Sequence, residues 1–597
     1  DLPMSLPYLL EPLIAGLVLA LCAWTAGARW VADRGLAATP IGEWALATAL
    51  GLGLLGGGGY ALATLGLLRG LPVALLAAAL ALPGVAPAGR VLRRLRLAGG
   101  ANRVELAVVA AFGAIALALA LYPPLPFDET LYHLPTARAY AASGGLPFLV
   151  DLRLPVSPAL CEVLAAEVLL FARATSVHLV SWLATAATAA LLVEWGGRRG
   201  SRAAGLWAAA IYVGSPLVLY LQGTAYVEPL LAMFATAGLL AWDVAERDGT
   251  GWRAAAIFSG FAAATKYLGL FLVAILLVRK GWRAWRERRW RGAFATSALA
   301  ALPMLLPYGR IFLATGNPLF PFASSIFGST AWSYNPGGGA GRVATLVEWL
   351  RAPFDAVFRP ARVGQQPPVS PAYLLVLALL LASWRRGGER FGRWALGLTA
   401  AYAAVLPLVH IRYLLPAAPA LALAGALSLT RWRALDAPRW SAALAVACLL
   451  PGLAWGTHRF AKLGPPPASA AAREAFLTRQ VPGYEGLAWL RSHGGEGATV
   501  YGAWCEQLRD YAGGRFLGEV TGPAAYWRVL DPAQPEVVYR RLRRLGVDHV
   551  LVPQTPRAAA RFAERLRASP LFREVYRGPS AAVYAVLGVP GAAEPGP

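Results

Sequence analysis

The fold is decided by residues 104–145, which read "VELAVVAAFGAIALALALYPPLPFDETLYHLPTARAYAASGG". Residues 104–122 form an apolar run that is long enough to cross a hydrocarbon core about 30 Å thick. Directly after this run, the chain places Asp128, Glu129 and His133 close together. Charged residues gathered at the mouth of an apolar run predict a functional site at a membrane surface.

Similar apolar runs recur along the 597 residues, of which 57% are hydrophobic. The mean hydropathy is +0.50, which soluble proteins rarely reach. No barrel-like alternation of apolar and polar residues appears, so the spans are predicted to be helices. The sequence predicts a polytopic α-helical membrane protein with about 13 transmembrane helices, at residues 8–27, 42–68, 71–88, 104–122, 176–193, 203–221, 228–245, 253–279, 293–313, 371–384, 393–409, 412–430 and 440–456.

The net charge of +23 comes largely from arginines in short loops between these spans. This distribution follows the positive-inside bias, and no basic patch is interleaved with base-stacking aromatics, which excludes nucleic acid as a partner. The basic loops are 90–103, 196–202, 246–253, 279–291, 384–393 and 431–440. If these loops are cytoplasmic, four regions lie on the outer side: loops 122–156 and 314–370, the corner 220–229, and the chain after about residue 457.

The chain is predicted to have three parts. Residues 1–103 form extra N-terminal transmembrane helices, residues 104–456 form the transmembrane core, and residues 470–597 form an α/β domain on the outer side. The stretch "GPPPASA" (464–470) is the linker. Within the last part, strands are predicted in 498–504, 547–554, 572–578 and 581–588, and helices in 535–546 and 556–569.

Two segments do not read as simple spans. Residues 253–279 form either one span or two short helices around Lys266. Residues 157–172 are apolar but short and carry Glu162 and Glu167, so we expect an interfacial or partly inserted helix there.

Two segments on the outer side carry acidic residues, and we call loop 122–156 the first acidic corner and residues 220–229 the second. Together they predict a catalytic or metal-binding site. Pro135 predicts a helix break at Leu134, and Glu129 and His133 would share one face if the preceding turn is helical. The second corner contributes Glu228. If these groups face a common space, they predict either general acid–base catalysis or the binding of a divalent cation, Mg²⁺ or Mn²⁺. The candidate ligands for such a cation are Asp128, Glu129, His133 and Glu228. The alternative for each acidic residue is a merely solvated side chain.

Cationic side chains on the same side predict an anionic ligand. Lys266 is one of three lysines and lies inside an apolar segment, where an ionisable group is costly and points to function. Arg412 begins a predicted span at its outer end, and Arg138 and Arg310 are also predicted there. Guanidinium groups suit phosphate oxygens. Snorkelling of Lys266 and interfacial anchoring of the arginines are the alternatives.

In their order and sidedness, several segments resemble the type C glycosyltransferase superfamily, in particular the group of protein O-mannosyltransferases and aminoarabinose transferases. They are "YPPLPFDETLYHLPTARAY", "SPLVLYLQGTAYVEPLL", "GFAAATKYLGL", "TGNPLFPF" and "RYLLPAAPAL". Together with the outer C-terminal domain, they cover about residues 104–456 and the tail. The sequence departs from the family's pattern in two places. Three predicted spans precede the acidic loop, where the simplest family plan has one, and Glu228 stands where Asp is common.

This resemblance implies a polyprenyl-phosphate-linked hexose or pentose as donor, and a glycan, lipid or protein as acceptor. It implies inverting transfer at the outer face of the plasma membrane of a prokaryote. Asp128 would be the general base, Glu129 would support it or hold a cation, and Glu228 would be the second acidic group. Lys266 and Arg412 would bind the lipid phosphate, with Arg138, Arg310, His133 and Tyr132 as further binding residues. Metal dependence varies in the superfamily, so no cofactor is implied with certainty.

Two other functions fit the same residues. A transporter or flippase of an anionic, phosphate-bearing lipid would use the same cations, although no internal repeat supports that interpretation. A non-catalytic scaffold of the same fold would bind a partner through its outer domain.

Overall fold

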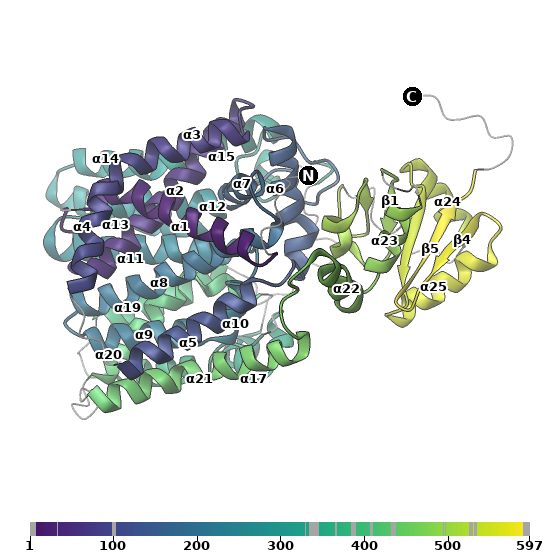
Figure 1. Ribbon diagram of the computed structural model, residues 1–597. Helices are drawn as coiled ribbons and strands as arrows, with labels where there is room; N and C mark the ends of the chain where they lie inside the picture. The colour runs from purple at the N-terminus through teal and green to yellow at the C-terminus, as the bar shows by residue number, and fades with distance from the viewer. Residues whose placement is uncertain are drawn as a thin grey trace.

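The computed structural model describes residues 8–588, apart from 33, 98–102, 329, 333–344, 365–366, 384–389, 406–409, 431–437, 494, 496, 524–528 and 531–533. A large block of helices makes up most of the chain, and a smaller domain with a sheet is attached at one end of it (Figure 1). The parts of loop 314–370 and of the basic loops 384–393 and 431–440 that fall in these gaps lie outside the described residues.

Seven helical segments in the described part of the chain are long and apolar enough to cross a membrane. They are α1 (Leu10–Val31), α2 (Pro40–Thr64), α3 with α4 (Gly70–Ala81 and Val85–Leu97), α8 (His178–Arg198), α11 (Glu228–Asp248), α14 with α15 (Arg291–Ala301 and Leu305–Thr315) and α21 (Pro438–Leu463). Three shorter apolar helices are α9 (Arg202–Val213), α18 (Ala372–Ser383) and α20 (Ala418–Leu429). This composition fits an integral membrane protein.

The other helices of the block are shorter, more polar or interrupted. They are α5 (Arg103–Ala120), α6 (Leu134–Ser143), α7 (Leu160–Leu169), α10 (Pro216–Leu221), α12 (Trp252–Thr265), α13 (Leu268–Glu287), α16 (Ser324–Phe327), α17 (Leu346–Phe358) and α19 (Arg390–Val405). Short 3₁₀ or π turns join several of them: η1 (Leu82–Gly84), η2 (Glu129–His133), η3 (Ala174–Val177), η4 (Leu302–Met304), η6 (Pro360–Val363) and η8 (Ile411–Leu414).

The segment 253–279 is two helices. Helix α12 ends at Thr265, and Lys266 takes an extended conformation (φ −158°, ψ 148°) before α13 begins. The segment predicted as one span at 203–221 is also divided, because Pro216 cannot donate the hydrogen bond that would continue α9. Helix α7 is short but buried rather than interfacial, and both of its glutamates are inside the block.

The first two helices cross at very close range. A Cβ atom on Gly27 of α1 would lie 1.8 Å from the carbonyl oxygen of Ala47, and a Cβ atom on Gly51 of α2 would lie 1.7 Å from that of Ala23. Small residues at such a crossing let two backbones touch, as is common in membrane helix pairs. Substitution of either glycine therefore requires the pair to move apart.

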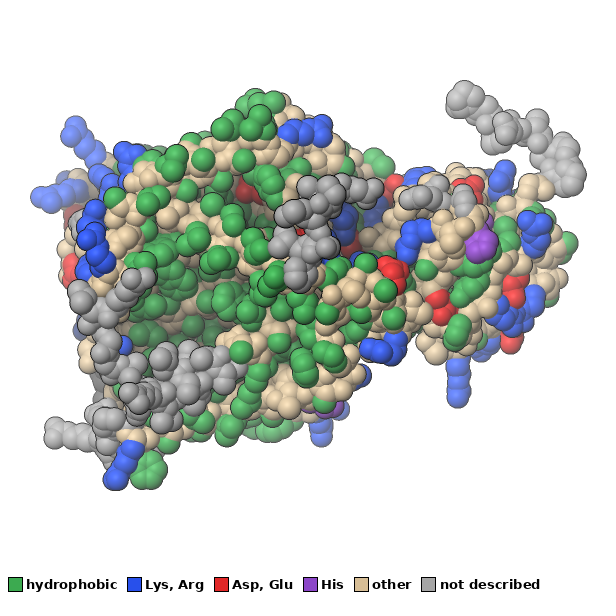
Figure 2. Space-filling view, viewed as in Figure 1, with side chains coloured by type: hydrophobic (Ala, Val, Ile, Leu, Met, Phe, Trp, Pro, Cys, Tyr) green, Lys and Arg blue, Asp and Glu red, His purple; other side chains and the backbone are tan. Residues whose placement is uncertain are grey.

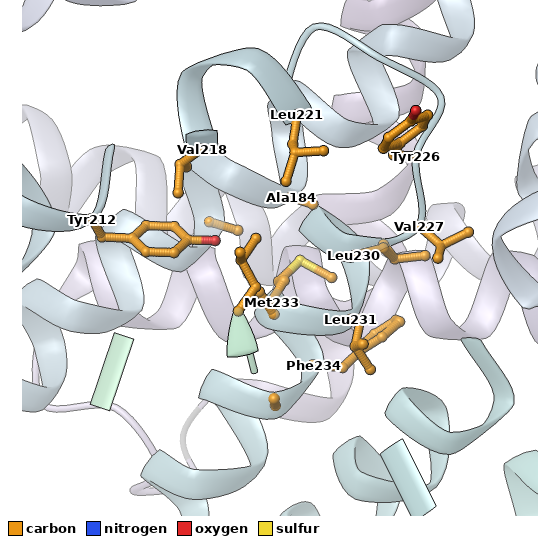
Figure 3. Packing of buried hydrophobic residues seen from close by; sticks show 14 of the residues in the cluster. Ala184, Tyr212, Val218, Leu221, Tyr226, Val227, Leu230, Leu231, Met233 and Phe234 are labelled. Atoms are coloured by element: carbon orange, nitrogen blue, oxygen red, sulfur yellow. The ribbon is translucent and has the colours of Figure 1, made fainter. Parts of the chain in front are cut away.

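Helix α11 is the centre of the block. Its side chains are nearly all buried, and it packs on α8 and α12. Figure 3 shows Leu230, Leu231, Met233 and Phe234 in this packed layer, with Tyr226 at its edge and the hydroxyl directed away from it. The first residue of α11 is Glu228, so the most buried of the seven long apolar helices presents a carboxylate at its end.

Large apolar side chains are also exposed on the outside of the block. Leu71 is 72% exposed, Leu82 70% and Phe294 70%. Figure 2 shows this face as mostly apolar, with Lys and Arg gathered at the end away from the C-terminal domain. An apolar surface of this extent needs a covering, and a bilayer supplies one.

The C-terminal domain is built around a five-stranded mixed sheet in the order β2-β1-β3-β5-β4. Strand β1 is parallel to β2 and β3, while β5 is antiparallel to β3 and β4. Its strands are β1 (Val500–Gly502), β2 (Phe516–Leu517), β3 (His549–Pro553), β4 (Phe572–Arg577) and β5 (Ala581–Val586). Its helices are α22 (Ala470–Gln480), α23 (Tyr484–Ser492), η10 (Glu506–Tyr511), α24 (Pro535–Arg544) and α25 (Arg557–Ala568).

Ion pairs and hydrogen bonds fasten this domain to the helical block. Arg515 binds Asp151 through two contacts of 2.8 Å. Arg138 binds Asp510 at 2.7 and 3.3 Å, and the hydroxyl of Tyr511 donates to the carbonyl of Pro124. Turn η10 thereby packs on η2, directly beside the first acidic corner.

Candidate active site

Four charged side chains form a continuous row at the end of the block that faces the C-terminal domain. We call Asp128, Arg412, Glu228 and Lys266 the charged row. Arg412 binds Asp128 through Nη2, and its Nε lies 3.3 Å from Oε1 of Glu228. Lys266 binds the same oxygen of Glu228 at 2.8 Å. Two acids and two cations from distant parts of the chain therefore meet.

Each member of the row sits where a helix begins or is interrupted. Asp128 directly precedes η2, and Arg412 belongs to the single turn η8. Lys266 occupies the break between α12 and α13, and Glu228 begins α11. A carboxylate in the first turn of a helix is stabilised by the helix dipole. The interruptions free backbone and side chains to face a common space.

The row is deeply set, but it is accessible at its two ends. The side chain of Glu228 is 1% exposed and that of Arg412 is 6% exposed. Asp128 is 19% exposed and Lys266 is 24% exposed. A ligand can therefore reach Asp128 and Lys266 first, while the two inner residues hold the row together.

Three tyrosines surround the row. The Tyr226 ring lies 4.9 Å from the Arg412 guanidinium, and the Tyr413 ring lies 4.5 Å from the Lys266 amine. The hydroxyl of Tyr226 accepts a hydrogen bond of 3.1 Å from the backbone N–H of Asp128. Burial, with the charge of Asp128 adding to it, holds the pKa of Tyr132 well above its usual value. Tyr132 therefore stays a neutral hydrogen-bond donor.

Glu129 does not join the row. Its Oε1 accepts a hydrogen bond of 3.0 Å from the backbone N–H of Ala225 and lies 2.5 Å from Nε2 of His178. Nδ1 of His178 contacts the carbonyl oxygen of Ala120 at 2.9 Å. Glu129 thus ties the first corner to the second corner, to α8 and to the end of α5. Among these described residues, Glu129 therefore makes no side-chain contact with the row, and Asp128 is the carboxylate that faces it.

His133 also has a separate partner, and the local geometry differs from the predicted α-helix. Residues 129–133 form a π-helical turn that runs directly into α6, so the predicted break at Leu134 is wrong. Pro135 would clash with the carbonyl of residue 131 in an α-helix, and a wider turn relieves that clash. His133 and Glu129 then point to different neighbours, and Nδ1 of His133 binds Glu162 at 2.7 Å.

The other two predicted phosphate ligands lie outside the row. Arg138 binds Asp510 of the C-terminal domain. Arg310 binds the hydroxyl of Tyr140 and the carbonyl of Pro147, each at 3.1 Å. In this arrangement both arginines fasten the outer loop 122–156 rather than face Lys266 and Arg412.

The predicted cation ligands do not fit a metal ion. Asp128 and Glu228 are neutralised by Arg412 and Lys266, while Glu129 and His133 have the separate partners His178 and Glu162. Within the described ranges, no group of three His, Cys, Asp or Glu side chains could hold a metal ion. We therefore derive no chemical step from a cation.

An apolar cavity of about 280 Å³ lies beside η8. Its wall includes Ile411 and Leu414 of η8, on either side of Arg412 and Tyr413 in the chain, and Trp349 of α17 lies on the wall as well. Among the described lining residues, none belongs to the charged row, so the cavity is reached from η8 through Ile411 and Leu414.

Several site residues were missed by the sequence analysis. Tyr226 lies two positions before Glu228, and Tyr413 directly follows Arg412, so their neighbourhood alone could have suggested them. His178 gave no comparable local signal, because its partner Glu129 is 49 positions away.

Comparison with known proteins gives three findings. A family model described as SF2091/S2213 matches residues 472–585, which lie within the C-terminal domain. No curated protein matches the chain. Among solved structures, the chain is similar to ArnT from Cupriavidus metallidurans bound to undecaprenyl phosphate, with 16% identity and a TM-score of 0.47 over 81% of this chain and 98% of that chain.

A second solved structure is the arabinofuranosyltransferase AftD from Mycobacteria. The identity is 16% and the TM-score is 0.48, over 82% of this chain and 42% of that chain. For the apo state of ArnT from Cupriavidus metallidurans, the identity is 15% and the TM-score is 0.48, over 81% of this chain and 98% of that chain. Identities and scores at this level do not establish function, which must be sought in the residues of the site itself.

Proposed function

We propose that the chain is a membrane glycosyltransferase that moves a sugar from a polyprenyl-phosphate donor to an acceptor on the outer side of a membrane. The observation that carries this proposal is the charged row. A departing phosphate needs positive charge, which Arg412 and Lys266 supply. A hydroxyl nucleophile needs a carboxylate within reach, which Asp128 supplies. Both requirements are met within one connected group of side chains.

The reaction is an inverting displacement at the anomeric carbon. The acceptor hydroxyl oxygen forms a bond to that carbon while the bond from the carbon to the phosphate oxygen breaks. The hydroxyl proton passes to the Asp128 carboxylate. The electron pair of the broken bond leaves with the polyprenyl phosphate, whose added negative charge is held by Arg412 and Lys266.

Donor binding also prepares Asp128 for its role. Arg412 binds Asp128 directly, so the carboxylate is engaged by the guanidinium and is not free to contact an acceptor hydroxyl. The phosphate of the donor competes for the same guanidinium and releases Asp128 toward the acceptor. The row therefore makes the base available when the leaving group is in place.

The remaining groups suit the sugar and the lipid. Oε2 of Glu228 is buried and has no hydrogen-bond partner among the described residues, so it is placed to accept a bond from a sugar hydroxyl. The apolar cavity beside η8 is placed to receive the first part of the prenyl chain. The adjoining C-terminal domain can select the acceptor or cap the site.

The first test is the release of polyprenyl phosphate from radiolabelled polyprenyl-phosphate hexoses and pentoses. The purified full chain is incubated with extracted membrane acceptors, with and without a chelator. We expect Asp128→Asn to lower the rate about 100-fold or more, the usual contribution of a general base. The matched control is Asp355→Asn, which removes an acid of α17 that pairs only loosely with Arg362, at 3.9 Å.

The test separates this proposal from its rivals. Equal loss in both variants contradicts a role for Asp128 as base. If no donor is turned over but donor binding survives Asp128→Asn and fails in Lys266→Ala, the chain is a lipid transporter. If no donor binds to the wild-type chain, the non-catalytic scaffold is the better interpretation.

A further inference from the structure

A second and larger cavity lies between α1, α2, α12 and α14, with a volume of about 760 Å³. Its walls are mainly apolar and include Leu50, Leu54 and Phe261. A volume of this size is typical of sites that hold a small molecule or part of a lipid. The charged row contributes none of the described residues that line it.

This cavity runs from the opposite end of the block, at Trp252, inward along α12 as far as Phe261. Trp252 lines it at the start of α12, whereas Lys266 of the charged row follows the end of the same helix. Helix α12 has 14 residues, and at about 1.5 Å per residue it places Trp252 about 20 Å from Lys266 along the helix axis. The loops at this end are basic, and Figure 2 shows Lys and Arg gathered there. The positive-inside bias makes this the cytoplasmic end.

The mouth of the cavity carries positive charge. Among the described lining residues, the charged ones are Arg34 and Arg253, and none is acidic. The nearby Asp248 faces Arg198 at 4.0 Å. Trp30 and Trp252 also line the cavity, and the Arg34 guanidinium lies 5.7 Å from the Trp30 ring. Arginine and tryptophan beside an apolar space form the usual pattern at the level of lipid headgroups.

We propose that this cavity binds one anionic phospholipid of the cytoplasmic leaflet. The phosphate would lie between Arg34 and Arg253, and the acyl chains would occupy the apolar space. Basic pockets between transmembrane helices on the cytoplasmic side bind anionic headgroups, and guanidinium groups favour phosphate oxygens. The site is distinct from the charged row, so this inference does not depend on the proposed glycosyl transfer.

Gly57 keeps this space open. A Cβ atom there would meet only the ring of Phe261, at 3.7 Å, and Gly57 itself lines the cavity. A larger side chain at this position would therefore project into the cavity without a clash with neighbouring backbone. Gly57→Leu is thus a means to fill the site.

The test uses the purified full chain and two probes, phosphatidylglycerol and phosphatidylcholine. Native mass spectrometry measures how many molecules bind, and a phosphatidylglycerol with a photoactivatable acyl chain shows where. We expect one phosphatidylglycerol to bind about tenfold more tightly than phosphatidylcholine, with cross-links to α2 or to residues 249–261. Arg34→Gln/Arg253→Gln should abolish this preference, and Gly57→Leu should abolish the cross-links.

Two control variants carry the same changes elsewhere. Arg202→Gln/Arg291→Gln removes two exposed arginines outside the cavity, and Gly397→Leu adds the same side chain to a helical glycine with open space around it. Both should behave as wild type. The proposal is overturned if the wild-type chain binds the two lipids equally, if the preference survives loss of both arginines, or if the cross-links lie elsewhere.

Discussion

Arg412 holds two carboxylates at once, and the charged row depends on it more than on Lys266. It contacts Asp128 from one nitrogen and Glu228 from another, and its side chain is 6% exposed. Lys266 binds only Glu228 and is 24% exposed. Only the planar fork of arginine reaches two acids in this way. A phosphate that takes one arm of the fork still leaves Glu228 bound to Lys266.

This difference predicts unequal costs in stability. Arg412→Ala leaves Asp128 without its partner and Glu228 with one cation, so we expect a loss of about 3–5 kcal/mol, as for breaking a buried ion pair. Lys266→Ala should cost about 1–3 kcal/mol because water reaches the lysine. Thermal unfolding in detergent measures both. Asp128→Asn in the Arg412→Ala background should recover part of the loss, because it neutralises the carboxylate left without its partner. Equal shifts for the two single variants would contradict this ranking.

The members of the row could be predicted from sequence, whereas the partners of their neighbours could not. Sidedness from the basic loops brings the segments of Asp128, Glu228, Lys266 and Arg412 to one face, and hydrophobic patterning is enough to show that. The pairing of Arg138 with Asp510 joins positions 372 apart. Which partner Arg138 takes is decided by tertiary packing, and the spacing of residues along the chain does not encode that packing.

At the level of elements, the π-helical turn η2 lets one short segment serve two purposes. Asp128 faces the row, while Glu129 faces inward to Ala225 and His178. Consecutive side chains of a helical turn project in different directions, so Asp128 and Glu129 meet different neighbours. Turns of this kind are frequent at functional sites, and Pro135 at the start of α6 favours one here.

The inward contacts predict that Glu129 acts by positioning the second corner. Glu129→Gln keeps an oxygen that can accept hydrogen bonds from the N–H of Ala225 and from His178, and loses only the charge, so it should cost about 1 kcal/mol of stability. Glu129→Ala leaves both groups buried without a partner and should cost about 2–4 kcal/mol. Thermal unfolding and donor turnover should be measured together. If Glu129→Gln loses as much activity as Asp128→Asn while remaining stable, Glu129 takes part in the reaction itself.

At the scale of the whole molecule, the sheet domain is part of the surroundings of the site. Its internal elements are those that the sequence predicted, apart from the short strand β2, the helices α22 and α23 and the turn η10. Each predicted element shows a clear period or turn signal. Its attachment was not predictable. Asp510, Tyr511 and Arg515 bind loop residues far away in the chain, and η10 rests on η2. Release of the domain should therefore disturb the corner that carries Asp128.

The contact between Arg138 and Asp510 gives this attachment a testable dependence on pH. The Asp510 side chain is 1% exposed. Burial raises the pKa of its carboxyl above the usual value, and the charge of Arg138 opposes that rise. In Arg138→Ala the opposing charge is gone, so the pKa in the docked state rises further. Docking then favours the protonated form. Docking of the domain is strongest below the pKa of the free carboxyl, about 3.9. It is lost as pH rises through the pKa that Asp510 has in the docked state.

We therefore expect the Arg138→Ala variant to undock as pH is raised from 5 to 8, while the wild-type chain changes less because Arg138 still pairs with Asp510. Cleavage of the linker 464–470 by proteinase K reports undocking, and the wild-type chain at each pH calibrates the protease. Arg138→Ala/Asp510→Asn has no titrating group at this contact and should resist cleavage equally at both pH values. Faster cleavage of Arg138→Ala at pH 5 than at pH 8 would mean that Asp510 docks as a carboxylate, and that its pairing rather than its burial governs the contact.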